Sequence, residues 1–131
     1  MNAKDTAQKW TSSVNQVTIG ATTAEGGTRS KTITIGGARC VPWLAYEGEV
    51  GRQPSIAIEI WDTNAQTWSE ELRTQYGKDM NNPISWALKA VESGADLICL
   101  RLIGTHPDID NKGPDETAEL VSQLLKAVDL P

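Results

Sequence analysis

The chain has 131 residues, 39% of them hydrophobic, with a formal charge of −5 at pH 7 and a pI near 4.8. This acidic balance argues against nucleic acid or an anionic membrane as a partner, because both favour a basic surface. No apolar run approaches the roughly 18 residues of a membrane span. The first residues are polar and lack an apolar signal region. We therefore expect a cytoplasmic protein that binds neither nucleic acid nor membrane.

The two cysteines, Cys40 and Cys99, stand alone in the sequence. Neither belongs to a CxxC motif or to a Cys/His pair with the spacing of a zinc or iron–sulfur site. We therefore expect no metal bound by this chain alone, and two buried thiols in a reducing compartment.

The first half of the chain predicts a β-hairpin. Residues 1–15 are polar, and we expect them to be frayed or to form a short helix. Residues 17–20 and 31–36 alternate apolar and polar side chains, rich in Thr, Ile and Val, which is typical of half-buried strands. We therefore expect an antiparallel hairpin over 16–36 with a long loop. Residues 37–55 carry repeated Gly and Pro and indicate an irregular connection.

The second half predicts alternating strands and helices. Residues 56–61 and 96–103 are nearly continuous in apolar side chains, as strands covered on both faces would be. Between them, Asn82 is a suitable cap and Pro83 a suitable first residue for a helix that ends before Gly94. A shorter helix is expected after Thr67, which forms a possible capping box with Glu70, and a third helix begins at Pro114.

The order of elements predicts an α/β fold. An N-terminal hairpin is followed by β-α-β-α, and two strands joined through a helix are expected to be parallel. Such alternation begins either a doubly wound sheet or a TIM (β/α)8 barrel. Two parallel strands leave a sheet edge open. We therefore expect residues 56–131 to be the first two β/α units of an incomplete sheet or barrel, or part of a sheet that another chain completes.

Two charges interrupt the predicted buried strands. Because side chains alternate faces along a strand, Glu59 and Arg101 point away from the large aliphatic residues, toward a barrel interior. An unpaired buried charge costs several kcal/mol, so we expect the two to form an ion pair. The ion pair either has a purely structural role or forms the polar base of a ligand-binding site.

The candidate site residues lie after the strands, where barrel folds place their sites. After the second strand, Thr105, His106 and Asp108 are candidates for cofactor binding. In the hairpin loop, we expect Gly26, Gly27, Thr28 and Arg29 to contact an anion or a partner. The backbone N–H groups of a glycine-rich turn can bind an anion, and an Arg guanidinium binds phosphate through two parallel hydrogen bonds. No nucleophile and base pair is visible, so we assign no catalytic residue and leave open whether the chain is an enzyme.

These same residues carry a resemblance to a known family. It includes Val17–Thr22, Glu25–Ser30 and Ile35–Gly37, together with Tyr46–Glu49, Gly94–Leu102 and Thr105–Asp108. Over about residues 17–131 the chain resembles the N-terminal part of the small (delta) subunit of the corrinoid/iron–sulfur protein. That protein belongs to the acetyl-CoA decarbonylase/synthase (CO dehydrogenase/acetyl-CoA synthase) system.

The resemblance implies a function in one-carbon metabolism. It implies a TIM-barrel subunit without catalysis of its own, in an anaerobic cytoplasm, paired with a large subunit that holds cobalamin and an iron–sulfur cluster. The pair would carry a methyl group from a methyl-pterin to acetyl-CoA synthase in the reductive acetyl-CoA pathway. The pterin methyltransferase and the synthase would bind transiently. In this family the barrel is longer, so about six β/α units would be missing here.

Two alternatives remain at this point. One is a pterin-dependent methyltransferase barrel, in which Asp62 and Asp108 lie at the useful end of the strands. The other is an isolated fragment with no activity that self-associates through its open edges.

Overall fold

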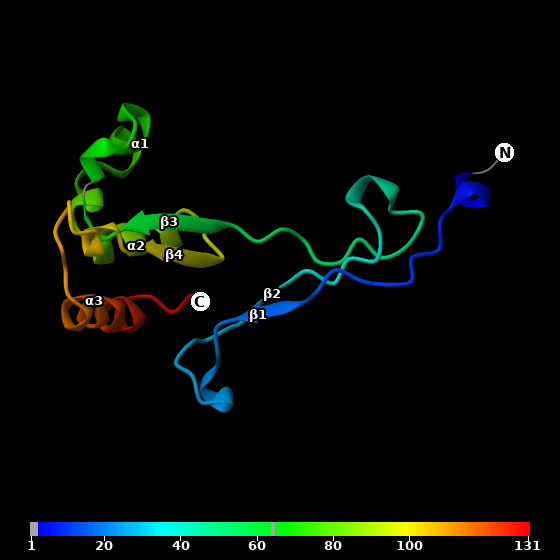
Figure 1. Ribbon diagram of the computed structural model, residues 1–131, viewed down its shortest axis with the longest axis horizontal. Coiled ribbons are helices and arrows are strands. Elements are labelled where there is room, and N and C mark those ends of the chain that lie inside the picture. The colour runs from blue at the N-terminus through cyan, green and yellow to red at the C-terminus, as the bar shows by residue number, and fades with distance from the viewer. Residues whose placement is uncertain (1–2, 64) are drawn as a thin grey trace.

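The computed structural model describes residues 3–63 and 65–131 and divides into an arm and a body (Figure 1). We call residues 3–55 the arm and the described residues of 56–131 the body. The fold is mixed α/β, with two small sheets and three α-helices among the described residues. The arm reaches away from the body, and its N-terminal end lies farthest from it. No helix in the described ranges is long and apolar enough to cross a membrane.

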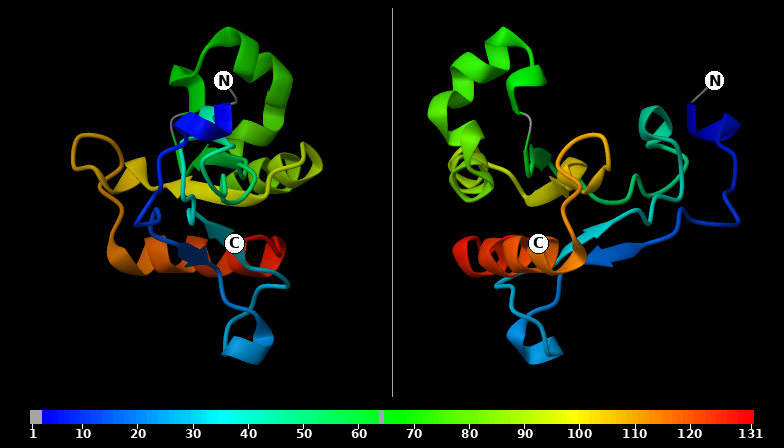
Figure 2. Two further views of the ribbon diagram at one scale, coloured as in Figure 1. Left: turned by 90° about the vertical axis from the view of Figure 1, so that its right-hand side faces the viewer. Right: turned by 60° about the vertical axis from the view of Figure 1, so that its left-hand side comes forward.

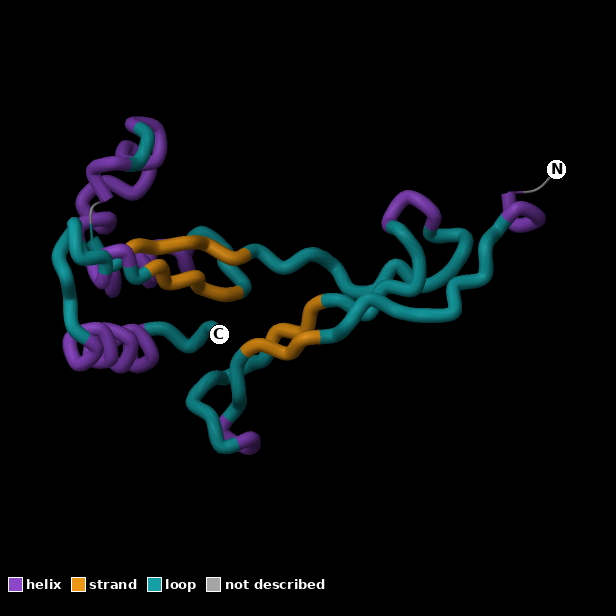
Figure 3. The backbone as a smooth tube through the Cα atoms, in the orientation of Figure 1, coloured by secondary structure: helices purple, strands orange, loops and turns teal. Residues whose placement is uncertain are grey.

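The arm is built around a short hairpin and is otherwise mostly loop (Figure 3). Strand β1 (Val17–Ile19) pairs antiparallel with β2 (Ile33–Ile35). The Oγ1 atoms of Thr18 and Thr34 lie 3.0 Å apart across the pair. The hairpin prediction is confirmed. A single turn of 3-10 helix over Ala3–Thr6 precedes it, within the segment expected to be polar and frayed or helical.

The body contains two parallel strands joined through a helix, as predicted. Strand β3 (Ala57–Trp61) pairs in parallel with β4 (Leu97–Arg101), with Ile60 opposite Leu100. Helix α2 (Pro83–Glu92) lies between them in the chain. Its start is confirmed in detail, because the Asn82 side chain accepts hydrogen bonds from the amides of Ile84 (2.8 Å) and Ser85 (3.2 Å).

Helix α1 differs at its start from the prediction. It covers Glu70–Tyr76 with Ser69 as its N-cap, so Thr67 does not cap it. The reason is local, because Ala65–Thr67 forms a separate 3-10 turn and Thr67 belongs to that turn. Helix α3 (Pro114–Ala127) begins at the proline predicted for it.

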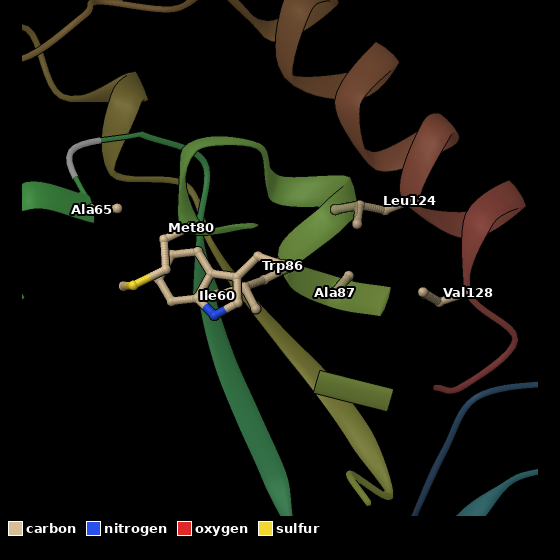
Figure 4. Packing of buried hydrophobic residues seen from close by; sticks show 7 residues of the cluster. All are labelled: Ile60, Ala65, Met80, Trp86, Ala87, Leu124 and Val128. Carbon is tan, nitrogen blue, oxygen red and sulfur yellow. The ribbon is translucent and has the colours of Figure 1, made fainter. Parts of the chain in front are cut away.

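The hydrophobic core lies on one face of the β3–β4 sheet, under helices α2 and α3 (Figures 2 and 4). Ile60 and Trp86 are completely buried at its centre. Burial of each such side chain contributes about 1.5–3 kcal/mol. The Trp86 ring meets Trp68 edge-on, with centroids 5.1 Å apart, and this adds a favourable aromatic contact. The cluster also contains Ala65, Met80, Ala87, Leu124 and Val128.

The opposite face of this sheet is open. Ala57 of β3 and Cys99 and Arg101 of β4 are exposed there. The expectation of two buried thiols is therefore wrong for Cys99, while Cys40 in the arm is buried. The physical reason is that helices cover one face of the two strands, so the apolar sequence of β4 is packed on one side.

Candidate functional site

A buried ion pair joins the two loops that follow β3 and β4. The Asp62 carboxylate, 1% exposed, accepts a hydrogen bond from the Gly104 amide at 3.0 Å through Oδ1. Its Oδ2 lies 3.1 Å from Lys112 Nζ, which also donates to the Asp62 carbonyl at 3.2 Å. Lys112 lies 3.6 Å from Asp110 as well. The buried carboxylate is thus hydrogen-bonded on both oxygens and paired with a cation through Oδ2, as a buried charge requires.

Glycine is required at position 104 by this arrangement. A Cβ atom there would come within 2.5 Å of Asp62 Oδ2 and 2.9 Å of Lys112 Nζ. Any side chain would therefore displace the ion pair. These contacts join the loop after β3 to the loop after β4.

Beside the ion pair lies a polar cavity of about 380 Å³. It is lined at the strand ends by acidic and amide side chains, among them Asp62, Gln66, Asn81, Asp108 and Asp110. These groups accept hydrogen bonds, so the cavity suits a ligand rich in N–H donors. Within the described part of the chain, no group of three or more His, Cys, Asp or Glu is arranged to hold a metal ion.

The three residues predicted for cofactor binding lie in one turn at this edge. Asp108 lines the polar cavity. Thr105 donates its hydroxyl to the Leu102 carbonyl at 2.8 Å, and His106 Nδ1 accepts from the Asp108 amide at 3.2 Å. The imidazole and the Asp108 carboxylate are mostly exposed, 3.9 Å apart. The turn thus uses Thr105 and His106 for its own contacts and presents Asp108 to the cavity.

Glu59 and Arg101 lie on the open face of the sheet. Arg101 Nη1 is 3.7 Å from Glu59 Oε1, and the two side chains are 59% and 41% exposed respectively. Trp61 completes the cluster: its Nε1 donates to Glu59 at 2.6 Å, and the Arg101 guanidinium lies 5.4 Å from its ring centre. Because these charges are hydrated, the ion pair contributes far less to stability than the several kcal/mol at stake for a buried ion pair.

The Arg29 guanidinium is buried against α3, whereas its sequence context suggested a side chain available to bind phosphate. It is 6% exposed, and its guanidinium donates to the backbone carbonyls of Leu125 and Val128, and to that of Leu130 at 3.3 Å. It therefore caps the carboxyl end of α3, where a positive charge complements the helix dipole. These backbone carbonyls accept hydrogen bonds from the guanidinium N–H groups that would otherwise be available to bind an anion.

The other hairpin residues predicted to contact an anion or a partner shape the turn. Gly26 has φ +80°, which favours glycine, and a Cβ at Gly27 would collide with the Ala21 carbonyl. Thr28 Oγ1 accepts from Arg29 Nη2 at 3.0 Å and orients the guanidinium. The conformation of the loop therefore places the Arg29 side chain against the end of α3.

Sequence reasoning missed Lys112 and the contact between Arg29 and α3. Lys112 is 50 residues from Asp62, and Arg29 is 99 residues from Val128. No periodicity or spacing joins residues so far apart. The one local signal was an Asp placed directly after a buried strand.

The whole of this framework falls within one family model. Residues 16–131 match the model described as the CO dehydrogenase/acetyl-CoA synthase delta subunit, which includes the hairpin, Arg29, both parallel strands and the buried ion pair. The chain belongs to this family. The resemblance read from the sequence is confirmed.

Curated members of the delta-subunit family give the scale of the relationship. The chain is 34% identical over 95% of its length to an acetyl-CoA decarbonylase/synthase complex subunit delta of Archaeoglobus fulgidus. It is 32% identical over 94% to subunit delta 1 of Methanosarcina thermophila, and 34% over 95% to subunit delta of Methanocaldococcus jannaschii. The chain spans between 27% and 30% of the length of these three relatives.

Proposed function

We propose that this chain serves in the non-catalytic subunit of a corrinoid methyl-carrier protein, supporting methyl transfer from a methyl-pterin to acetyl-CoA synthase. The observation that carries the proposal is the family match over residues 16–131, continuous from the hairpin to the end of the body. The relatives are named as subunits of an acetyl-CoA decarbonylase/synthase complex. The proposed partners are a large corrinoid subunit and, transiently, the methyltransferase and the synthase.

The proposed fold is the start of a (β/α)8 barrel, with the hairpin at 16–36, the connection at 37–55 and two β/α units at 56–131. Parallel pairing of β3 with β4 supports it. So does the backbone after α3, which returns to the outer edge of β4, where the Ile98 amide donates to the Pro131 carbonyl at 2.9 Å. A third parallel strand would begin its pairing with β4 in this way.

The cobalamin and the iron–sulfur cluster of the proposed assembly are assigned to the partner. In the described residues, the free thiols Cys40 and Cys99 lie in the arm and on β4 respectively, and do not form a cluster ligand set. The polar cavity of about 380 Å³ is smaller than a corrin ring with its side chains. The residues present do not by themselves fit either group.

A binding experiment with the large corrinoid subunit tests the proposal. The chain and the purified large subunit are mixed and followed by sedimentation velocity at the corrin absorbance. The expected result is a faster-sedimenting corrin boundary that contains both proteins. A corrin boundary unchanged by an excess of the chain contradicts the proposal.

A pterin-binding barrel is the second candidate, favoured by the acidic lining of the polar cavity. Pterins present several N–H donors, which Asp108 and Asn81 at the cavity could accept. Asp62 is already bound to Gly104 and Lys112, so Asp108 is the carboxylate available. Calorimetry with a methyl-pterin on the chain alone tests this candidate. Binding that Asp108→Asn weakens supports it, and no measurable heat contradicts it.

A further inference from the structure

The loop between β4 and α3, residues 104–112, is closed by its own backbone (Figure 2). The Lys112 amide donates to the Gly104 carbonyl at 2.9 Å and joins the two ends of the loop. Inside it, the amides of Ile109 and Asn111 donate to the His106 carbonyl at 3.0 and 3.2 Å. The backbone of the loop is therefore held around His106, and the side chains it carries are placed by it.

The His106 side chain completes this turn. Its Nδ1 accepts a hydrogen bond at 3.2 Å from the amide of Asp108, two residues further along the chain. Asn and Asp side chains commonly make this contact in turns, and here an imidazole makes it. Pro107 lies between the two and restricts the backbone, so the ring stays within reach of Asp108. An imidazole nitrogen accepts a hydrogen bond only while it carries no proton, so the turn as it stands requires neutral His106.

The same ring nitrogen also faces the Asp108 carboxylate. Nδ1 lies 3.9 Å from Asp108 Oδ2, and both side chains are exposed to solvent. A proton on Nδ1 turns this atom from an acceptor into a donor with a positive charge, which attracts the carboxylate. Protonation therefore removes the contact with the Asp108 amide and favours a contact with the Asp108 carboxylate.

The other charged side chains around this turn have positions of their own. They come from the loop after β3, from the same loop and from α3: Asp62, Asp110, Lys112, Glu116 and Glu119. The two aspartates lie 3.1 and 3.6 Å from the Lys112 ammonium, and the two glutamates line a second hollow beside it. The opposite wall of the polar cavity contributes the neutral amides of Gln66 and Asn81. Within the described chain, Asp108 supplies the carboxylate that lies within 4 Å of the imidazole.

We propose that His106 is a pH-dependent switch that sets how well the Asp108 carboxylate can serve a ligand in the polar cavity. Neutral His106 binds the amide of Asp108 and leaves the carboxylate free at the cavity. Protonated His106 releases the amide and competes for the carboxylate. Because histidine changes its charge between about pH 5 and pH 8, the switch operates in that range.

The inference rests on the second candidate of the proposed function, because the ligand is the donor-rich pterin proposed there, and it adds the regulation of that site. A ligand that uses the Asp108 carboxylate binds the neutral form of His106 more tightly. Its binding therefore weakens in acid and releases a proton from the imidazolium.

The switch is first tested on the chain without ligand. The sequence contains one histidine, so the imidazole signals in a nuclear magnetic resonance spectrum belong to His106. We expect a ¹⁵N–¹⁵N coupling across the hydrogen bond from the Asp108 amide to Nδ1 at about pH 8, and its loss at about pH 5.5. A coupling that is absent at the higher pH, or that persists after the ring is protonated, overturns the switch.

The effect on binding is measured by calorimetry with a methyl-pterin at the same two pH values. His106→Asn is the matched variant, because an Asn side chain can accept the same hydrogen bond and does not titrate. On acidification the wild type is expected to lose about two- to fivefold more affinity than the variant, which is the size of an exposed ion pair. Titration of the pterin itself affects both proteins equally and cancels in this comparison. Circular dichroism checks that the variant keeps the fold.

The outcomes separate this inference from the function on which it rests. Equal losses of affinity in the wild type and in His106→Asn overturn the regulation and leave the pterin candidate standing. Tighter binding by the wild type in acid overturns it in favour of an imidazolium that contacts the ligand directly. No heat with either protein at either pH contradicts the pterin candidate, and the regulation of its binding fails with it, whereas the coupling still decides whether His106 switches in the free chain.

Discussion

The arm and the body reach a defined structure by different physical means. The body has a hydrophobic core, in which Ile60 of β3 and Trp86 of α2 are fully buried between the sheet and the helices. In the described arm, the residues below 9% exposure are Cys40 and Arg29. The arm is instead ordered by backbone hydrogen bonds, glycine turns and its contact with α3. A core confers stability that is shared over many contacts, whereas the arm depends on a few polar ones, so single changes should separate the two.

The largest effect is expected in the core of the body. Trp86→Ala removes the ring that packs against Trp68 and Tyr76, which costs about 3–5 kcal/mol of unfolding free energy. Urea denaturation followed by far-ultraviolet circular dichroism measures it. Trp86→Phe is the control: it keeps a ring and removes the indole N–H, which has no hydrogen-bond partner. A loss for Trp86→Ala no greater than for Trp86→Phe would contradict the central role of this ring.

The next effect tests whether the body also depends on a polar contact. Lys112→Met leaves the Asp62 carboxylate, 1% exposed, without its cation, and we expect a loss of about 3 kcal/mol. The double variant Asp62→Asn with Lys112→Met should recover part of it, because no buried charge remains. A double-mutant cycle by urea denaturation measures the coupling. Additive losses in the cycle would mean that the two groups act independently.

A smaller effect is expected where the arm joins the body. Arg29→Ala leaves the carbonyls of Leu125 and Val128 without a donor, at a cost of about 2 kcal/mol. Amide hydrogen exchange should rise in the hairpin and at the end of α3 while α2 stays protected. Arg29→Lys should restore little, because an ammonium cannot reach several carbonyls with a planar fork. A uniform increase of amide hydrogen exchange across the body would contradict a local role for the contact between Arg29 and α3.

The smallest effect concerns the hairpin loop and pH. The Thr22 backbone amide and hydroxyl donate to Glu25, at 2.8 and 2.7 Å, and lower the pKa of its carboxyl below 4.5. A pKa lowered in the folded state means that the stabilisation is present above the unfolded pKa and is lost as pH falls through the folded one. Nuclear magnetic resonance should therefore show the loop loosening below about pH 4.5. Glu25→Gln should remove this pH dependence, and a loop that loosens equally in that variant would exclude Glu25 as its cause.

The sequence predicted elements with local signals and missed contacts between distant residues. Asn82 and Pro83 mark the start of α2 within one turn, and the hairpin alternation needs only neighbouring residues. The exposure of Cys99 was not predicted, because an apolar run does not reveal whether one or both faces of a strand are covered. Lys112 beside Asp62 and Arg29 beside α3 depend on how the body and the arm pack, which no local pattern encodes.

The contact between Arg29 and α3 has a consequence for the order in which parts of the chain fold during synthesis. Arg29 and Val128 are 99 residues apart. A chain made at about 5–20 residues per second leaves the arm without its anchor for roughly 5–20 s. The strands β3 and β4 and helix α2 can pair during that interval, since they need only nearby sequence. The arm should therefore join the body only after α3 has been made, so this contact is a late step relative to pairing of β3 with β4.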